Sequence, residues 1–214
     1  MSKAFHKRIG RTVTGIFVIA CLVCAPVSAV TVSSDHWSKN CITYLENSNI
    51  FNETHLRDLN GTDELTRAEF IAIMARSLSD MDISGIDSSG FDDVDDTDWF
   101  FDYVVMANEE GWLIDYDDDN LFGPEEKISR EEMIRTIAST SMLAVMGNGT
   151  ALDFDDIVRT GEDKYEYLDE LDRSTSNGII IGSDNNKFLP DKNLSLDELS
   201  TTIFNMWGGG GLLK

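Results

Sequence analysis

The stretch Leu65-Thr66-Arg67-Ala68-Glu69 decides the fold, because its pattern returns twice further along the chain. The two later copies are Ile128-Ser129-Arg130-Glu131-Glu132 and Leu194-Ser195-Leu196-Asp197-Glu198. The copies begin at residues 65, 128 and 194, so the pattern repeats with a period of just over sixty residues. Repetition at a fixed period indicates a chain built from similar supersecondary units.

Each copy has the features of a helix start. A Thr or Ser is followed three residues later by Glu, which is the pattern of a capping box, and an apolar residue precedes the cap. Apolar side chains then follow at helical spacing: Phe70, Ile71 and Met74; Met133, Ile134 and Ile137; Leu199, Ile203 and Met206. We therefore expect a helix to begin at each of the three segments.

A second helix is expected ahead of each of these segments. The apolar stripes that predict it follow an aromatic residue: Trp37 with Ile42 and Leu45, Trp99 with Val104 and Ala107, and Tyr165 with Leu168 and Leu171. Helix-stopping residues close these stretches at Asn49, Gly111 and Asn177-Gly178. Each unit is thus predicted to be a helix, a loop and a capped second helix.

Two further motifs are shared by the second and third copies. They are Phe91-Asp92-Asp93-Val94 with Phe122-Gly123-Pro124, and Phe154-Asp155-Asp156-Ile157 with Phe188-Leu189-Pro190. The first copy has residues 52–64 in place of the Phe-x-Pro loop. We place the repeats at 30–86, 87–149 and 150–207, followed by a flexible tail at 208–214. One unit of this size buries too little surface to be stable alone, so we expect the three to pack together.

Residues 1–29 resemble a secretory signal peptide. Four basic residues precede an uncharged, mostly apolar run at 12–25, and small residues follow Pro26 up to Ala29. We expect cleavage after Ala29 and export to the cell surface. Two alternatives stay open: a retained membrane anchor, since residues 12–30 carry no charge, and lipidation at Cys21.

The composition excludes several classes of protein. The chain has 214 residues with 17 Lys and Arg against 39 Asp and Glu, a net charge of -22, which excludes a simple electrostatic binder of nucleic acid. A hydrophobic content of 42% excludes a disordered acidic tail. No catalytic motif surrounds His36 or His55, so we expect a protein that is not an enzyme and needs no cofactor.

One acidic stretch resembles an EF-hand calcium loop. Asp115, Asp117, Asp119 and Glu126 have the required spacing. Asn120 occupies the position that needs Gly, and Pro124 interrupts the loop. A solvated acidic loop is therefore the main expectation, with calcium binding as the alternative.

The ordered motifs resemble the S-layer homology (SLH) domain family over residues 30–207, in three copies. The residues that carry the resemblance are the Phe-Asp-Asp starts, the Phe-x-Pro loops, Trp37, Trp99, Gly111 and the tetrapeptide Thr66-Arg67-Ala68-Glu69. The resemblance implies a mainly α fold, with three helix-loop-helix repeats packed as a pseudo-three-fold bundle and ligand grooves between them. It also implies non-covalent attachment to the bacterial cell wall or S-layer through an anionic secondary cell-wall polysaccharide, often pyruvylated, or through modified peptidoglycan.

The family's ligand contact carries over to Arg67 and Arg130, with Glu69 and Glu132 completing the binding motif. Arg forms paired hydrogen bonds with carboxylates, and the free backbone N–H groups expected at a helix start would add to anion binding.

The second copy is complete, so we expect its groove to contain Arg130, Trp99 and Gly111, with Trp99 either stacked on a sugar or packed in the core. The third copy has Leu196 in place of Arg, and we expect its groove to bind weakly or not at all.

Two alternatives remain open. Arg67 and Arg130 could be solvated side chains beside Glu69 and Glu132. The repeats could then form a structural scaffold that binds S-layer or other envelope proteins.

Overall fold

A computed structural model of the chain describes residues 30, 33, 36–78, 88–113, 120–140, 151–183 and 185–208. These residues form α-helices and two short 3-10 helices, and no β-strand occurs among them. The helices are α1 (Lys39–Asn47), η1 (Ile50–Asn52), η2 (Thr54–Leu56), α2 (Arg67–Leu78), α3 (Phe101–Glu109), α4 (Arg130–Ser139), α6 (Leu168–Ser176) and α7 (Leu196–Met206). The prediction of a mainly α fold is confirmed. The predicted signal peptide and nearly all of the predicted tail lie outside the described residues.

The three capped helices begin where the sequence predicts. In α4 the Glu132 N–H donates to Ser129 Oγ at 3.1 Å, and the Ser129 N–H donates back to the Glu132 carboxylate at 2.8 Å. The same reciprocal pair forms between Ser195 and Glu198 in α7 and between Thr66 and Glu69 in α2. Each cap contributes about 1 kcal/mol to helix stability.

The helices that precede them end at the predicted stop residues. Asn49, Gly111 and Gly178 have φ angles of 59°, 70° and 70°, the left-handed conformation that closes a helix. After Gly111 the Trp112 N–H donates to Ala107 O at 2.8 Å, and after Gly178 the corresponding bond from Ile179 to Ser174 O is 2.9 Å. These local predictions are confirmed.

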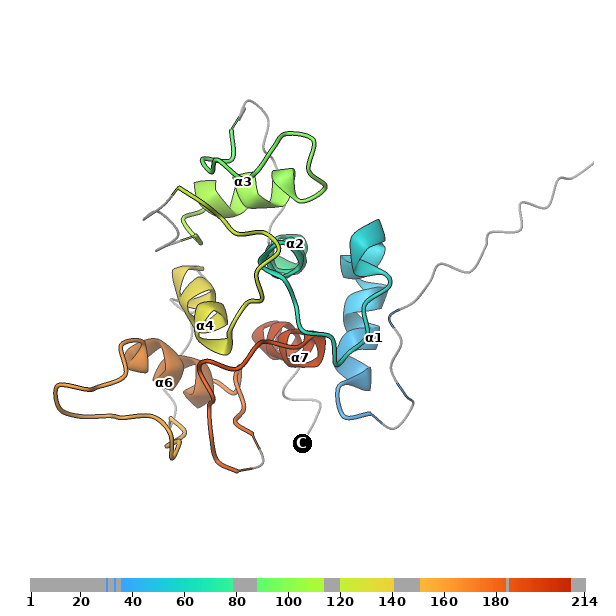
Figure 1. The fold of residues 1–214 in the computed structure, drawn as a ribbon. Coiled ribbons are helices and arrows are strands. Elements are labelled where there is room, and N and C mark those ends of the chain that lie inside the picture. The colour runs from blue at the N-terminus through green and yellow to red at the C-terminus, as the bar shows by residue number, and fades with distance from the viewer. Residues whose placement is uncertain are drawn as a thin grey trace, which may run out of the picture.

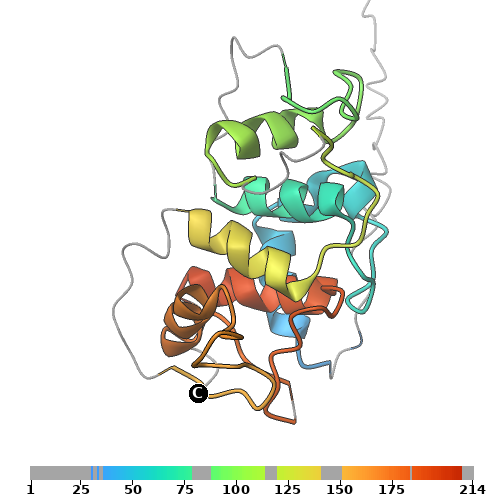
Figure 2. The same cartoon turned by 60° about the vertical axis from the view of Figure 1, so that its left-hand side comes forward.

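The helices contact one another in a cyclic order. Helices α2, α4 and α7 form an inner group, and α1, α3 and α6 lie outside it (Figures 1 and 2). Helix α3 packs on α2, α6 packs on α4, and α1 packs on α7. Each outer helix therefore rests on the inner helix of a different predicted repeat, and α1 joins the first repeat to the last.

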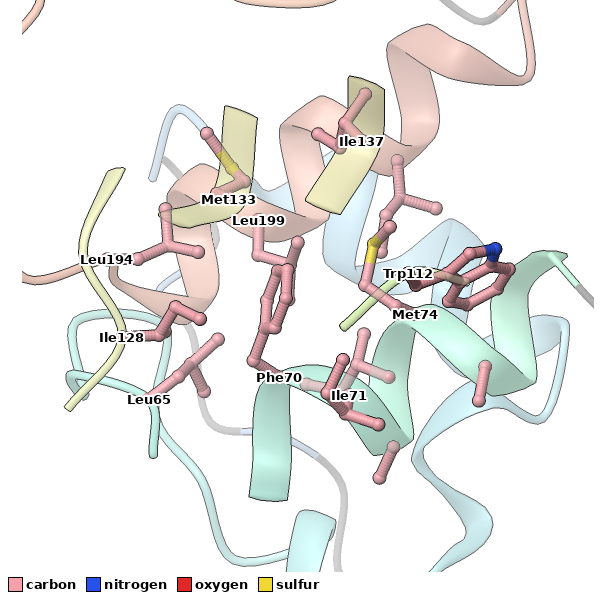
Figure 3. Packing of buried hydrophobic residues seen from close by; sticks show 14 of the residues in the cluster. Leu65, Phe70, Ile71, Met74, Trp112, Ile128, Met133, Ile137, Leu194 and Leu199 are labelled. Atoms are coloured by element: carbon pink, nitrogen blue, oxygen red, sulfur yellow. The ribbon is translucent and has the colours of Figure 1, made fainter. Parts of the chain in front are cut away.

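A ring of backbone hydrogen bonds links the three helix starts. The Leu65 N–H donates to Leu194 O at 2.9 Å, Leu194 donates to Ile128 O at 2.9 Å, and Ile128 donates to Leu65 O at 3.1 Å. All three side chains are fully buried and lie together at one end of the core (Figure 3). The apolar residue before each cap therefore forms a junction between the predicted repeats, which are called the first, second and third repeat below.

Candidate functional site

The Phe-Asp-Asp motifs hold the Phe-x-Pro loops in place. The Asp93 carboxylate accepts the Phe122 N–H at 2.7 Å and the Gly123 N–H at 2.8 Å. In the third repeat Asp156 accepts the N–H groups of Phe188 and Leu189 at 2.9 and 2.8 Å. The second Asp of each motif thus fixes the loop that packs against the preceding repeat.

These loops cover the helix starts. The Arg130 N–H donates to Lys192 O and the Glu131 N–H to Pro190 O, both at 3.0 Å. The corresponding bonds at α2 run from Arg67 to Glu126 O at 2.8 Å and from Ala68 to Pro124 O at 3.0 Å. The expectation of free backbone N–H groups beside the two arginines is therefore wrong, because loop carbonyls of the next repeat accept these bonds.

The Arg67 side chain joins the first repeat to the second. Its Nε donates to Glu132 Oε1 at 3.0 Å, and its Nη1 lies 2.7 Å from Glu126 Oε2. Gly123 has a φ of 66°, and a Cβ there would lie 2.5 Å from Arg67 Nη1. A glycine is thus needed at this point of the loop for both its conformation and its lack of a side chain.

Arg130 makes the corresponding junction between the second and third repeats, and it is more deeply buried. Its Nε donates to Phe188 O at 2.7 Å, its Nη1 to Glu198 Oε1 at 2.9 Å, and its guanidinium lies 5.0 Å from the centre of the Phe188 ring. Arg130 is only 5% exposed. Burial lowers the pKa of Arg130, and the carboxylate of Glu198 opposes that shift.

The reading of both arginines as simply solvated is therefore wrong. Each pairs with the capping Glu of the following repeat: Arg67 with Glu132, and Arg130 with Glu198. The third junction differs, because Leu196 occupies the position of the arginine and is fully buried. Within the described residues, the Glu69 carboxylate accepts a hydrogen bond only from Thr66 N–H, at 2.7 Å.

A pocket of about 460 Å³ opens beside Arg130. Its lining includes Phe188 and Lys192 of the third repeat and Trp37 of the first. Trp37 is 57% exposed, and Ile181, also in the lining, is 54% exposed. The side-chain hydrogen bonds that Arg130 makes within the described residues use Nε and Nη1, and none of them uses Nη2. The pocket thus combines a buried cationic donor with exposed apolar faces.

Two residues expected in the groove of Arg130 lie elsewhere. Trp99 stacks on His55 of η2, with ring centres 4.7 Å apart and an angle of 15° between the planes, and it packs partly buried against the core. Gly111 is the residue that ends α3. Neither lines the pocket, which the first repeat supplies with Trp37 instead. Sequence spacing marked Trp37 as a helix signal but contained no information on its exposure.

The structure describes only part of the stretch that resembles a calcium loop. Asp115, Asp117 and Asp119 lie outside the described residues, whereas Glu126 pairs with Arg67. Within the described ranges, no group of three or more His, Cys, Asp or Glu side chains is arranged to hold a metal. The solvated acidic loop stays the prediction, with calcium binding as the alternative. In the same ranges, no helix has the length and hydropathy needed to cross a membrane.

Comparison with known proteins agrees with this architecture. Over 94% of its length the chain is 27% identical to an S-layer protein of Bacillus thuringiensis subsp. finitimus and 28% identical to the S-layer protein sap of Bacillus anthracis. The aligned region covers 24% of each relative, so the chain spans about a quarter of their length. Residues 90–134 match the profile of the S-layer homology domain, from the Phe91-Asp92-Asp93 motif to the capping box of α4. Residues 90–134 of this chain therefore resemble an S-layer homology domain.

Proposed function

We propose that this protein binds a cell-wall polysaccharide non-covalently through the pocket beside Arg130, and that this binding holds it at the cell surface. The observation that carries the proposal is Arg130 itself, a residue only 5% exposed that lines the pocket and whose side-chain hydrogen bonds within the described residues use Nε and Nη1 rather than Nη2. The match to the S-layer homology domain and the similarity to S-layer proteins support the same conclusion.

The pocket favours a sugar that carries a carboxylate. A guanidinium N–H₂ group matches a carboxylate oxygen, and a charge-assisted bond of this kind is about twice as strong as a neutral one. The Lys192 ammonium, half exposed and 2.9 Å from Glu198, adds a second cation to the rim. The exposed ring of Trp37 offers an apolar face to the sugar. A pyruvyl ketal, which places a carboxylate on a sugar ring, fits this combination.

The net charge of the protein does not prevent such binding. The chain carries a charge of -22, which repels an anionic polymer at long range. At physiological ionic strength, however, exposed charges are screened beyond ~8 Å. Arg130 and Lys192 then act on a ligand within the pocket, where the distant carboxylates contribute little.

A scaffold that binds S-layer or other envelope proteins is the second candidate. The pairs Arg67–Glu132 and Arg130–Glu198 support it, because they hold the repeats together and would be useful without any sugar ligand. Such a scaffold would not need the Trp37 ring to be exposed beside the pocket.

Co-sedimentation of the full chain with purified bacterial walls tests the proposal. The walls are used intact and after removal of the secondary polysaccharide. We expect binding to intact walls only, weakened at least tenfold by Trp37→Ala. Trp99→Ala is the matched control, since Trp99 lies outside the pocket and its loss should lower stability without weakening binding. Equal binding to stripped walls, or no binding to any wall, would leave the protein scaffold as the better conclusion.

A further inference from the structure

The exposed Trp37 lies between two side chains that contact the same carboxylate. Ser38 is fully buried, and its hydroxyl donates to Asp197 Oδ1. His36 Nε2 lies 3.6 Å from Asp197 Oδ2, and His36 Nδ1 lies 3.0 Å from Ser38 Oγ. Asp197 is only 3% exposed. We call His36, Ser38 and Asp197 the clasp.

The clasp is linked to the Arg130 pocket through its sequence neighbours Trp37 and Glu198, which line that pocket. Asp197 is the second residue of α7, and its N–H donates to Gly61 O at 2.7 Å. A Cβ at Gly61 would overlap the Asp197 carboxylate, so the backbone closes directly on the clasp. Glu198, the next residue of α7, pairs with Arg130 and lines the pocket. The first turn of α7 therefore holds Arg130 through Glu198, and it holds the segment that carries Trp37 through Asp197.

The geometry of the clasp does not suit nucleophilic catalysis, although it joins a Ser, a His and an Asp. A catalytic triad places the imidazole between the hydroxyl and the carboxylate, so that it can take the proton of the hydroxyl. Here the Ser38 hydroxyl donates directly to Asp197 and has no exposed surface. The Ser38 hydroxyl is therefore not placed to attack a substrate.

We propose that the clasp positions Trp37 over the Arg130 pocket, so that its ring is already in place when a sugar arrives. This inference rests on the proposed function. Its physical reason is preorganisation, because a side chain ordered before binding loses less conformational entropy in the complex. The clasp also stands at the junction of the first and third repeats, where Leu196 occupies the position of the arginine and no Arg–Glu pair occurs among the described residues.

The position of Trp37 can be measured separately from wall binding. The full chain is labelled with 5-fluorotryptophan, and the fluorine signal of Trp37 is assigned by its loss in Trp37→Phe. In Ser38→Ala we expect the Trp37 signal to move and to change width while the other three tryptophan signals stay in place. Affinity for purified intact walls should fall about fivefold.

Asp197→Asn should act in the same way as Ser38→Ala. Its matched control is Asp169→Asn, which changes the same residue type at the second position of α6, where the side chain is exposed. Ser48→Ala, at the opposite end of α1, is the control for Ser38→Ala. Neither control should move the Trp37 signal. Asp197→Asn alters a buried carboxylate. If that variant unfolds, the result for Ser38→Ala decides whether the clasp positions Trp37.

The two proposals fail in different ways. An unchanged Trp37 signal in Ser38→Ala overturns the clasp. The clasp is also overturned if Trp37→Ala weakens wall binding and Ser38→Ala leaves it unchanged, although the proposed function then stands. If the wild-type chain binds no wall, the proposed function fails, and the role of the clasp in binding fails with it.

Discussion

Two junctions share the same pattern of backbone hydrogen bonds but differ in their side chains. One joins the second repeat to the third, and the other joins the third repeat to the first. Both belong to the hydrogen-bond ring of Leu65, Ile128 and Leu194. The junction between the second and third repeats pairs Arg130 with Glu198. The junction between the third and first repeats has Leu196 at the equivalent position, and Asp197 beside it binds Ser38. A buried leucine is therefore compatible with the fold at the position that the charged Arg130 occupies in the other junction.

This difference bears on the role of Arg130. Burying an ion pair costs desolvation, and replacing a buried pair by apolar residues is often neutral or stabilising. Leu196 shows that this chain tolerates the apolar solution at the equivalent position. An arginine that lines a pocket at the costlier position fits the proposed ligand binding better than a role in stability alone.

The largest expected effect is that of Arg130→Ala. The change leaves Glu198 without its guanidinium and Phe188 O without its donor, and breaking a buried pair typically costs about 3–5 kcal/mol. The free energy of unfolding in urea at pH 7 measures it. Arg67→Ala is the comparison, and we expect about 1–2 kcal/mol, the order of its lost hydrogen bonds, because the Arg67 side chain is less buried, at 19% exposed. Equal losses would show that burial does not distinguish the two junctions.

Glu198→Gln tests the acidic partner of the same junction. The amide keeps the cap but removes the charge, which we expect to cost about 2 kcal/mol at pH 7, the order of a hydrogen bond to a charged group. Burial alone would raise the pKa of Glu198, but the Ser195 N–H, Arg130 and Lys192 outweigh it, so the pKa is lowered.

The sign of the pH dependence follows from that lowered pKa. The stabilisation by Glu198 is complete above the unfolded value of about 4.3, and it is lost as the pH falls through the lower pKa of the folded state. The difference in unfolding free energy between wild type and Glu198→Gln should therefore shrink as the pH falls below about 4.3 and through the lower pKa of the folded state. Urea unfolding across that range measures it, and a constant difference would contradict the lowered pKa.

Arg130→Leu transfers the side chain of the third junction to the second. We expect a smaller loss of stability than in Arg130→Ala, because the leucine side chain fills space that alanine leaves empty, although Glu198 and Phe188 O lose the same donor in both variants. Wall binding should nevertheless fall as far as in Arg130→Ala, since the Nη2 donor is gone. A variant that is stable and still binds walls would remove Arg130 from the site.

The comparison also shows which features can be predicted from the sequence. Helix starts and ends depend on residues a few positions apart, so the capping boxes and the left-handed Asn49 and Gly111 could be predicted. The pairing of Arg67 with Glu132 could not, because the sequence places Glu69 much nearer to Arg67. Nor could the exposure of Trp37, which depends on how the first repeat meets α7.

The smallest expected effect is that of Glu69→Gln, and it tests whether the third junction truly lacks an ion pair. Gln also serves as the third residue of a capping box, so the cap on Thr66 should survive the change. With Leu196 opposite, the lost charge should cost less than about 0.5 kcal/mol, the range of an ordinary surface change. The same substitution at Glu132, which pairs with Arg67, should cost about 1 kcal/mol. Urea unfolding of the two variants side by side measures the contrast. If Glu69→Gln cost as much as Glu132→Gln, the carboxylate of Glu69 would have to neutralise some other cation, and the two junctions would be electrostatically alike. If the contrast holds, Leu196 has replaced an ion pair without loss to the fold, and the charge of Arg130 calls for an explanation outside the fold.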